Sequence, residues 1–311
     1  MRKLIFLLLF ISYLSFGQDC PPCEVIANPD MEITSVKSSW PKIKNKSIVK
    51  INSLTNILYE NQDDYWEQLK RPSWWMKEGR DPWTEDPIWG DGYIEPNLNF
   101  NSCVNDNLRW KCGYSYVLRF PENFKKNKKY PLVVFLHGGI NSNPRKLNSR
   151  ILTVNSFFIP ENDQYIIASP IKLGIDWSPK KIQDVIADIE SQLKIDKKRI
   201  YLTGLSMGGR GTFIVAAELP DLFAAIMPLS PHHTPYSYLN LASKVSHLPI
   251  FLHHSTNDKT SKFSVAEKMS DELKKLNANM LFDIGNFGHY GWNKIYKNPE
   301  NINWLISWKK E

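Results

Sequence analysis

The stretch Tyr201–Phe213, YLTGLSMGGRGTF, places a serine between two glycines at the end of an apolar run. A serine hydroxyl is a weak nucleophile at neutral pH, so it needs a histidine to take its proton and a carboxylate to orient that histidine. The pattern Gly204-x-Ser206-x-Gly208 also occurs by chance in tight turns. Ser206 is therefore a candidate nucleophile only if the rest of the chain supplies both partners.

The partners have to follow the serine in a particular order. When a nucleophilic serine stands on a sharp turn from strand to helix, the carboxylate comes next in the chain and the histidine last. Asp258 follows an apolar strand, although it could instead only cap a helix. Of the seven histidines, His289 alone comes after Asp258. We therefore predict Ser206 as nucleophile, Asp258 as acid and His289 as base.

The reaction also needs backbone donors where the carbonyl oxygen of the substrate becomes negative. Met207, directly after the serine, offers one amide. The sequence HGG beyond an apolar strand offers the second, from Gly139 or Ile140, because glycine lets the backbone approach the substrate. His137 in the same stretch is expected to hold this loop.

The elements that must position these residues alternate between apolar strands and amphipathic helices. This alternation predicts an α/β fold, with a mostly parallel central sheet and helices on both faces. Such sheets place their chemistry at the carboxyl ends of the strands. Strands are expected at 114–120, 132–136, 165–170, 199–204, 224–229, 249–254 and 280–282, and helices after residues 178 and 208, over 265–276 and at the C-terminus.

The N-terminus predicts export. Arg2 and Lys3 precede an apolar run and then small residues, which is typical of a signal peptide over residues 1–17. We therefore expect a secreted or periplasmic protein. A lipoprotein anchored at Cys20 is the alternative, but Gln18 and Asp19 do not fit its signal. No later stretch is long and apolar enough to predict an integral membrane protein.

Residues 18–112 have poor periodicity and contain seven of the eleven tryptophans. We interpret them as an irregular extension before a catalytic domain at 113–311, with its indoles either packed against that domain or forming a platform for sugar rings. Cys103 and Cys112 are the expected disulfide in an exported chain. Cys20 and Cys23 lack the strand and helix of a redox motif.

Charge and composition argue against several other classes. The formal charge is +7, but the basic residues are scattered next to acidic ones, so we expect no nucleic-acid binding. No cysteine and histidine cluster has the spacing of a metal site, and no metal or other cofactor is expected.

Several motifs together resemble a known group. From about residue 114 to 308, PLVVFLHGG, DKKRIYLTGLSMGGRGT, PDLFAAIMPLS, PIFLHHSTND and GHYGW are similar to exported esterases of the α/β-hydrolase superfamily, grouped with feruloyl esterases, polyhydroxybutyrate depolymerases and phospholipase/carboxylesterase-like hydrolases. The resemblance implies the α/β-hydrolase fold and the same three catalytic residues. Arg210, the loop PHHTPYSY and the extension depart from the usual pattern, which leaves the substrate specificity open.

The sequence therefore predicts an exported serine carboxylesterase. The resemblance and export favour feruloyl or acetyl esters, as small molecules or on polysaccharides. A serine peptidase with the same three residues and a non-catalytic carbohydrate-binding protein remain the alternatives. Candidate substrate-binding residues, each of which could equally serve packing, are His232, His233, Tyr236 and Trp292.

Overall fold

A computed structural model describes residues 36–43, 47–55, 114–139, 152–171, 177–234 and 237–311. The expected signal peptide and all four cysteines lie outside these residues. Of the seven tryptophans in the extension, Trp40 is described and the other six are not. None of the helices in the described ranges combines the length and apolarity needed to cross a membrane.

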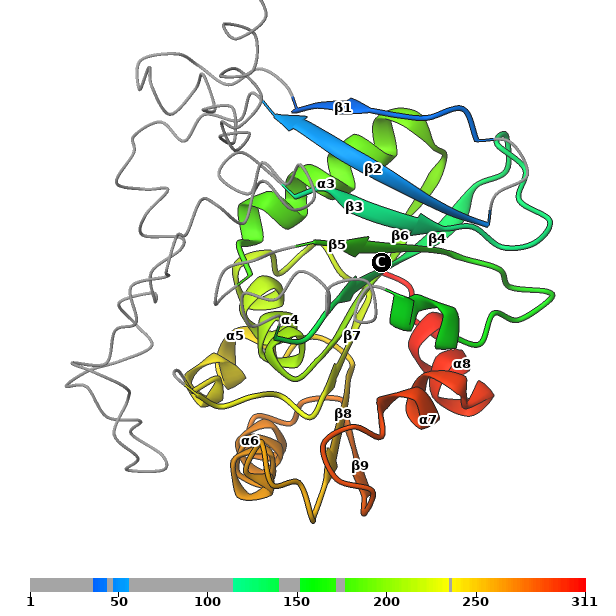
Figure 1. The fold of residues 1–311 in the computed structure, drawn as a ribbon. Helices are drawn as coiled ribbons and strands as arrows, with labels where there is room; N and C mark the ends of the chain where they lie inside the picture. Colours follow the sequence, from blue (N-terminus) through cyan, green and yellow to red (C-terminus); the bar gives the residue numbers. More distant parts are fainter. Residues whose placement is uncertain (1–35, 44–46, 56–113, 140–151, 172–176, 235–236) are drawn as a thin grey trace, which may run out of the picture.

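The described residues form one nine-stranded sheet in the order β1-β2-β3-β5-β4-β6-β7-β8-β9 (Figure 1). The first four strands in this order pair antiparallel, and β5 to β9 pair parallel. The strands are β1 (Val36–Ser39), β2 (Ile48–Thr55), β3 (Tyr116–Arg119), β4 (Tyr130–Leu136), β5 (Ile166–Pro170), β6 (Ile195–Leu205), β7 (Ala225–Leu229), β8 (Ile250–Ser255) and β9 (Met280–Gly285).

Helices cover both faces of this sheet, as the sequence predicts (Figure 1). On one face lie α3 (Pro179–Gln192), α4 (Met207–Glu218), η3 (Leu239–Leu241), α5 (Ala242–Val245) and α6 (Phe263–Lys275). On the other lie η2 (Leu152–Ser156), α7 (Trp292–Lys297) and α8 (Pro299–Ser307). Strands such as β4 and β7 are buried along their whole length, which explains why they are continuous apolar runs rather than alternating ones.

Helix α3 shows how the local sequence sets an element. Ser178 caps its start by accepting a hydrogen bond from the Lys181 amide, and Pro179 stands at the first helical position, where no amide donor is needed. The predicted apolar side of the helix, which includes Ile182 and Ile189, is buried in the core beneath it.

The chain end differs from the single predicted helix. It forms two helices, because Pro299 cannot continue α7. Asn298 caps the second helix by accepting a hydrogen bond from the Glu300 amide.

Part of the predicted irregular extension is regular. Strand β2 pairs with β3 and so continues the main sheet beyond the predicted domain boundary at residue 113. Trp40 follows β1, and its indole donates a hydrogen bond to Asp188 of α3, with 3.2 Å between Nε1 and Oδ2. This contact favours the interpretation that Trp40 packs against the main domain over the interpretation that it forms a platform for sugar rings.

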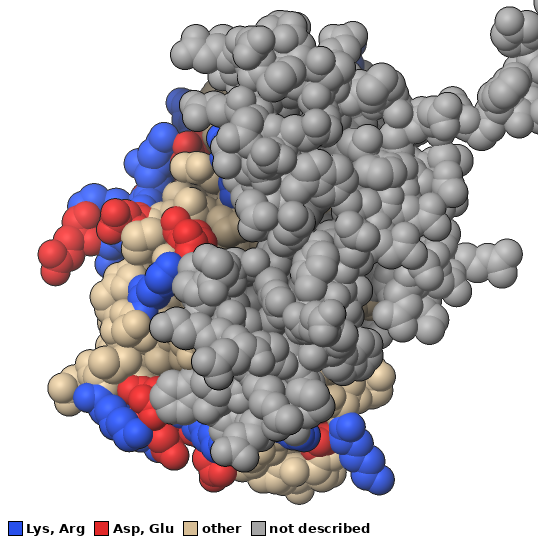
Figure 2. All heavy atoms as spheres, turned by 90° about the vertical axis from the view of Figure 1, so that its left-hand side faces the viewer, with Lys and Arg blue, Asp and Glu red and all other residues tan. Residues whose placement is uncertain are grey.

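Figure 2 shows how charged side chains are distributed on one face of the molecule. On the face that Figure 2 presents, basic and acidic residues of the described part alternate over short distances. This agrees with the scattered charge of the sequence.

Candidate active site

Ser206 stands on a strained turn between β6 and α4. Its φ is 56°, in the left-handed region that residues other than glycine rarely adopt. The Ser206 amide donates to Leu229 O at 2.9 Å, and its carbonyl accepts from the Arg210 amide at 3.0 Å, so both sides of the turn are fixed. Strain of this kind persists only where the surrounding structure holds it, and it is typical of functional sites.

The glycines around Ser206 are required by close backbone contacts. A Cβ at Gly204 would lie 2.3 Å from Gly208 O, and a Cβ at Gly208 would lie 2.0 Å from Leu136 O. Neither neighbour is a flexible side chain that could move away. The two glycines therefore let α4 start directly against the ends of β4 and β6.

The three predicted residues meet at the carboxyl edge of the sheet. His289, in the loop between β9 and α7, has Nε2 2.9 Å from Ser206 Oγ. Its Nδ1 lies 2.7 Å from Oδ2 of Asp258, in the loop after β8. Ser206 is 8% exposed and His289 is 6% exposed, so this hydrogen-bonded chain is almost closed to water.

Asp258 is held in its ionised form. Burial alone would raise its pKa, but hydrogen bonds from His254, His289 and the Ser261 amide outweigh burial and hold the pKa of this carboxyl well below its usual value. An ionised Asp258 can only accept, so His289 Nδ1 carries the proton. Nε2 is then free to accept the proton of the Ser206 hydroxyl.

The loop after β4 lies against the start of α4. A Cβ at Gly139 would lie 2.7 Å from Met207 Sδ, so the two predicted oxyanion segments are neighbours. His137 is 1% exposed, and its Nδ1 lies 2.7 Å from Gly138 O. Its ring also packs edge-on against Trp177, with 4.9 Å between the ring centroids. These contacts suit a residue that holds the loop, while Ile140 lies outside the described residues.

Of the candidate substrate-binding residues, His232 has a backbone hydrogen bond to Ser206. Its amide donates to Ser206 O at 3.0 Å. Its Nδ1 lies 3.1 Å from Ser261 Oγ and its Nε2 2.9 Å from Thr234 Oγ1, so the ring is fixed at both nitrogens. Burial, followed by Arg210, His233 and His289, lowers the pKa of His232 to about 3, so the imidazole is neutral near pH 7.

The other candidates are placed differently. His233 is 7% exposed and accepts a weak hydrogen bond from the Lys262 amide at 3.4 Å. Trp292 is 6% exposed and packs edge-on against His289, with 5.0 Å between the centroids. Their burial favours packing around the site over direct contact with a substrate. Tyr236 lies outside the described residues.

Arg210, which departs from the usual pattern, holds the loop after β7. Its side chain is fully buried, and Nη1 donates to the carbonyls of His232 and Thr234. These donated hydrogen bonds fix the backbone of the loop after β7. The loop that carries His232 is thereby held to α4, at a position four residues after Ser206.

Two further residues contact the site and were not predicted from the sequence. His254 has Nε2 3.3 Å from Asp258 Oδ2, and Asn257 forms two hydrogen bonds to the loop that carries His289. Both residues lie just before Asp258, at or after the end of strand β8. This position in the sequence could have identified them as candidates.

The described residues contain no group of three or more histidine, cysteine, aspartate or glutamate side chains arranged to hold a metal ion. Ser206, His289 and Asp258 form one hydrogen-bonded chain. The arrangement suits proton transfer to and from a serine nucleophile.

Residues 162–289 match the dienelactone hydrolase family. The chain is 27% identical over 193 residues to a bifunctional acetylxylan esterase/xylanase of Neocallimastix patriciarum, and 23% identical over 192 residues to a protein of Aspergillus terreus named "Probable feruloyl esterase C". These matches cover 58% and 56% of this chain, but only 27% and 65% of the relatives. This chain therefore spans less than two thirds of either relative.

Among solved structures, a thermostable esterase aligns with a TM-score of 0.53 and 23% identity, over 63% of this chain and 60% of the other. The parallel sheet, the serine turn and this alignment define the fold of the described residues as the α/β-hydrolase fold. The resemblance to α/β-hydrolase esterases seen in the sequence is thereby confirmed.

Proposed function

We propose that this protein is a serine carboxylesterase that cleaves acyl esters through an acyl-enzyme. The observation that carries the proposal is the continuous hydrogen-bonded chain from Ser206 Oγ through His289 to Asp258. The match to the dienelactone hydrolase family and the esterase names of the relatives support the same class.

The mechanism follows from the protonation states. Ser206 Oγ attacks the ester carbonyl carbon while its proton passes to His289 Nε2, which makes a tetrahedral oxyanion. His289 then gives the proton to the leaving alcohol, and an ester between Ser206 and the acyl group remains. A water molecule enters, loses a proton to His289 and attacks this ester. The proton returns to Ser206 Oγ as the carboxylic acid leaves. Asp258 stays ionised throughout and stabilises the imidazolium.

The oxyanion would be met by the amides of Met207 and of Gly139 or Ile140. Donors that are fixed before a substrate binds cost no reorganisation during the reaction. Losing one such donor typically costs about 3 to 4 kcal/mol of transition-state stabilisation. The close approach of Gly139 to Met207 supports the first of the two loop amides.

The substrates we propose are acetyl or feruloyl esters on polysaccharides, in an extracellular or periplasmic setting. The relatives that match are named for acetylxylan and feruloyl esters, and the N-terminal residues have the pattern of a signal peptide. A disulfide between Cys103 and Cys112 would suit that setting.

The test compares the full chain with Ser206→Ala on p-nitrophenyl acetate, methyl ferulate, acetylated xylan and a set of peptides. Hydrolysis of the esters and not the peptides is expected, with loss of turnover and of fluorophosphonate labelling in Ser206→Ala. Ser264→Ala, an exposed serine on α6, is the matched control and should keep activity. Ester cleavage that survives in Ser206→Ala would refute the proposal, and peptide cleavage would change the class to a peptidase.

A further inference from the structure

The backbone ladder between β8 and β9 stops just short of the residues that hold Asp258 and His289. The last registered pair of these parallel strands is Ser255 with Gly285. One further bond, from the Thr256 amide to Gly285 O at 2.9 Å, ends the ladder. The chain then turns, since the Asp258 amide donates back to Ser255 O at 3.1 Å. The main chain of the Asp258 loop therefore no longer pairs with the His289 loop.

The side chain of Asn257 bridges the gap at this point. Its Nδ2 donates to Asn286 O at 2.7 Å, and its Oδ1 accepts from the Gly288 amide at 2.8 Å. The side-chain amide of Asn257 therefore donates to a backbone carbonyl and accepts from a backbone N–H, as a peptide group does in a sheet. Because the two partners have opposite polarity, only one orientation of the Asn257 amide satisfies both.

The bridge joins the two loops immediately beside the predicted catalytic groups. Asn257 precedes Asp258, and Gly288 precedes His289. The hydrogen bond from His289 Nδ1 to Asp258 Oδ2 is therefore flanked by a second link between the same two loops. We propose that Asn257 is a positioning residue that sets the His289 imidazole in register with Asp258 and Ser206. This inference rests on the proposed esterase function.

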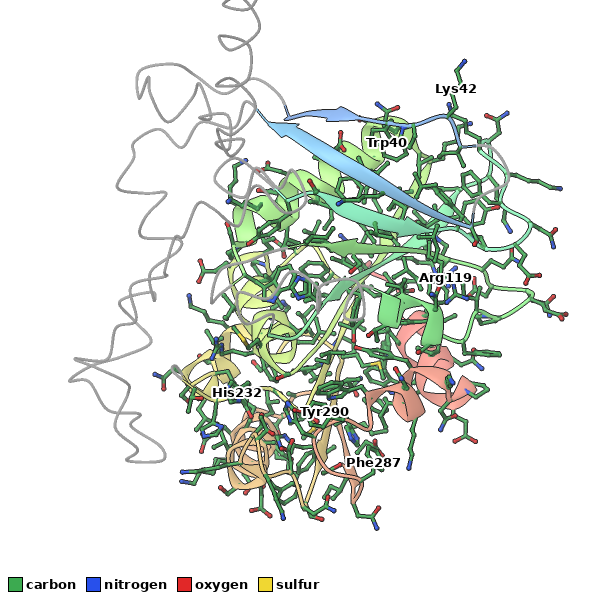
Figure 3. The ribbon with its side chains drawn as sticks, viewed as in Figure 1. Trp40, Lys42, Arg119, His232, Phe287 and Tyr290 are labelled. Atoms are coloured by element: carbon green, nitrogen blue, oxygen red, sulfur yellow. The ribbon has the colours of Figure 1, made fainter. Side chains whose placement is uncertain are left out.

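Ring contacts also hold the His289 loop against the sheet. Phe287, labelled in Figure 3, lies in this loop. Its ring stacks on His253, with 5.2 Å between the ring centroids, and Lys294 Nζ lies 4.9 Å from the centre of the Phe287 ring. Gly291 makes room for Phe287, since a Cβ there would lie 1.6 Å from a ring carbon. These contacts are apolar or cation–π and so tolerate small shifts. A hydrogen-bonded amide pair fixes distance and direction more tightly.

Asn257 is exposed, which separates its effect on stability from its effect on catalysis. Water can replace its hydrogen bonds when the side chain is removed, so the folded state should lose little stability. A displacement of about 1 Å at a catalytic group can nevertheless lower the rate roughly 100-fold. A positioning role therefore predicts loss of activity in a chain that remains folded.

The experiment compares Asn257→Ala, Asn257→Asp and Asn286→Ala in the full chain, using p-nitrophenyl acetate. Asn257→Ala removes both bonds. Asn257→Asp keeps an acceptor for the Gly288 amide but turns an oxygen toward Asn286 O. Asn286→Ala is the matched control, since that side chain is exposed on the same loop and makes no hydrogen bond within the described residues, while its carbonyl is kept.

Both Asn257 variants should lose about 10-fold to 100-fold in kcat, with KM changed less than about threefold and an unchanged thermal unfolding midpoint. Asn286→Ala should keep the wild-type kcat. The inference is overturned if Asn257→Ala matches Asn286→Ala, or if Asn257→Asp keeps full kcat, because then two bonds are not needed. Asn257→Asp, which has nearly the same size, also carries the test should Asn257→Ala fail to fold.

The activity of the wild-type chain distinguishes failure of the proposed esterase function from failure of the positioning role of Asn257. Wild-type protein that neither hydrolyses esters nor labels at Ser206 contradicts the proposed function itself. Active wild-type protein with fully active Asn257 variants contradicts only the positioning role.

Discussion

His254, in β8, and His289, in the loop after β9, both contact Oδ2 of Asp258. His254 Nε2 lies 3.3 Å from this oxygen, and His289 Nδ1 lies 2.7 Å from it. The His254 ring is fully buried, and its Nε2 also lies 3.0 Å from Ser261 O. Because both of these neighbours can only accept, His254 Nε2 carries a proton. His254 therefore donates a hydrogen bond to Asp258 and stabilises its negative charge.

Removing this donor should lower activity. We expect His254→Phe, which keeps a ring of similar size, to lose about 10-fold to 100-fold in kcat/KM, because a hydrogen bond to a charged group contributes about 1.5–3 kcal/mol. His254→Gln should recover part of the loss, since its amide can donate near the position of Nε2. Steady-state kinetics on p-nitrophenyl acetate measure the effect.

The control is His247→Gln, an exposed histidine whose contact is to the Pro220 carbonyl. It should behave as wild type. Wild-type kinetics in a folded His254→Phe would show that Asp258 needs no second histidine.

A second prediction concerns the packing beneath the loop after β4. A Cβ at Gly211 would lie 2.2 Å from a ring carbon of Trp177. The indole is 1% exposed and contacts the His137 ring, so it cannot move without disturbing the loop that carries Gly139. Overpacking a buried site costs about 1–3 kcal/mol. Gly211→Ala should therefore lower both the free energy of unfolding and kcat.

Urea unfolding and ester kinetics test this prediction, and a double-mutant cycle identifies its cause. Trp177→Phe makes room for the added methyl group, so the double variant should be less destabilised than the two single variants together. Additive losses would mean that the clash with Trp177 is not responsible.

The sequence predicted the parts of this molecule that depend on local patterns. The apolar run at β4 and the spaced isoleucines of α3 each indicate their element without help from the rest of the chain. The order of Ser206, Asp258 and His289 is also a property of the sequence, and the structure brings these three side chains into hydrogen-bond contact. Their catalytic role stays a prediction.

What could not be predicted depends on partners far away in the chain. Residues 48–51 join the main sheet because they pair with β3, more than 60 positions later. Whether Trp40 packs or is exposed depends on Asp188, which lies in α3. An asparagine in a turn is common, and the role of Asn257 depends on its hydrogen bonds to the backbone of Asn286 and Gly288, about 30 residues later. Local periodicity carries no information about such pairings.

The last prediction follows from the buried state of His232 and concerns acid stability. Burial, then Arg210 and His233, lowers the pKa of His232 to about 3, whereas the unfolded chain has an ordinary value near 6.5. Asp258 and His289 also face this ring, and Asp258 acts in the opposite, raising direction. Between about pH 6.5 and pH 3, His232 is therefore protonated in the unfolded state and neutral in the folded state. Stability contributed by neutral His232 is complete above pH 6.5 and is lost as the pH falls toward 3, by about 1.4 kcal/mol per pH unit at most.

Replacing the titrating ring should flatten this dependence. The free energy of unfolding of His232→Gln, measured by urea titration at several pH values, should fall less steeply than that of the wild type between pH 6.5 and about 3. Asp258, whose lowered pKa also makes stability fall with acid, acts only below its ordinary pKa near 4, so the upper half of the window reports on His232. Equal slopes of the two proteins between pH 6.5 and 4.5 would mean that His232 is protonated in the folded state as readily as in the unfolded one. That result would contradict the conclusion that the His232 ring is neutral in the folded protein.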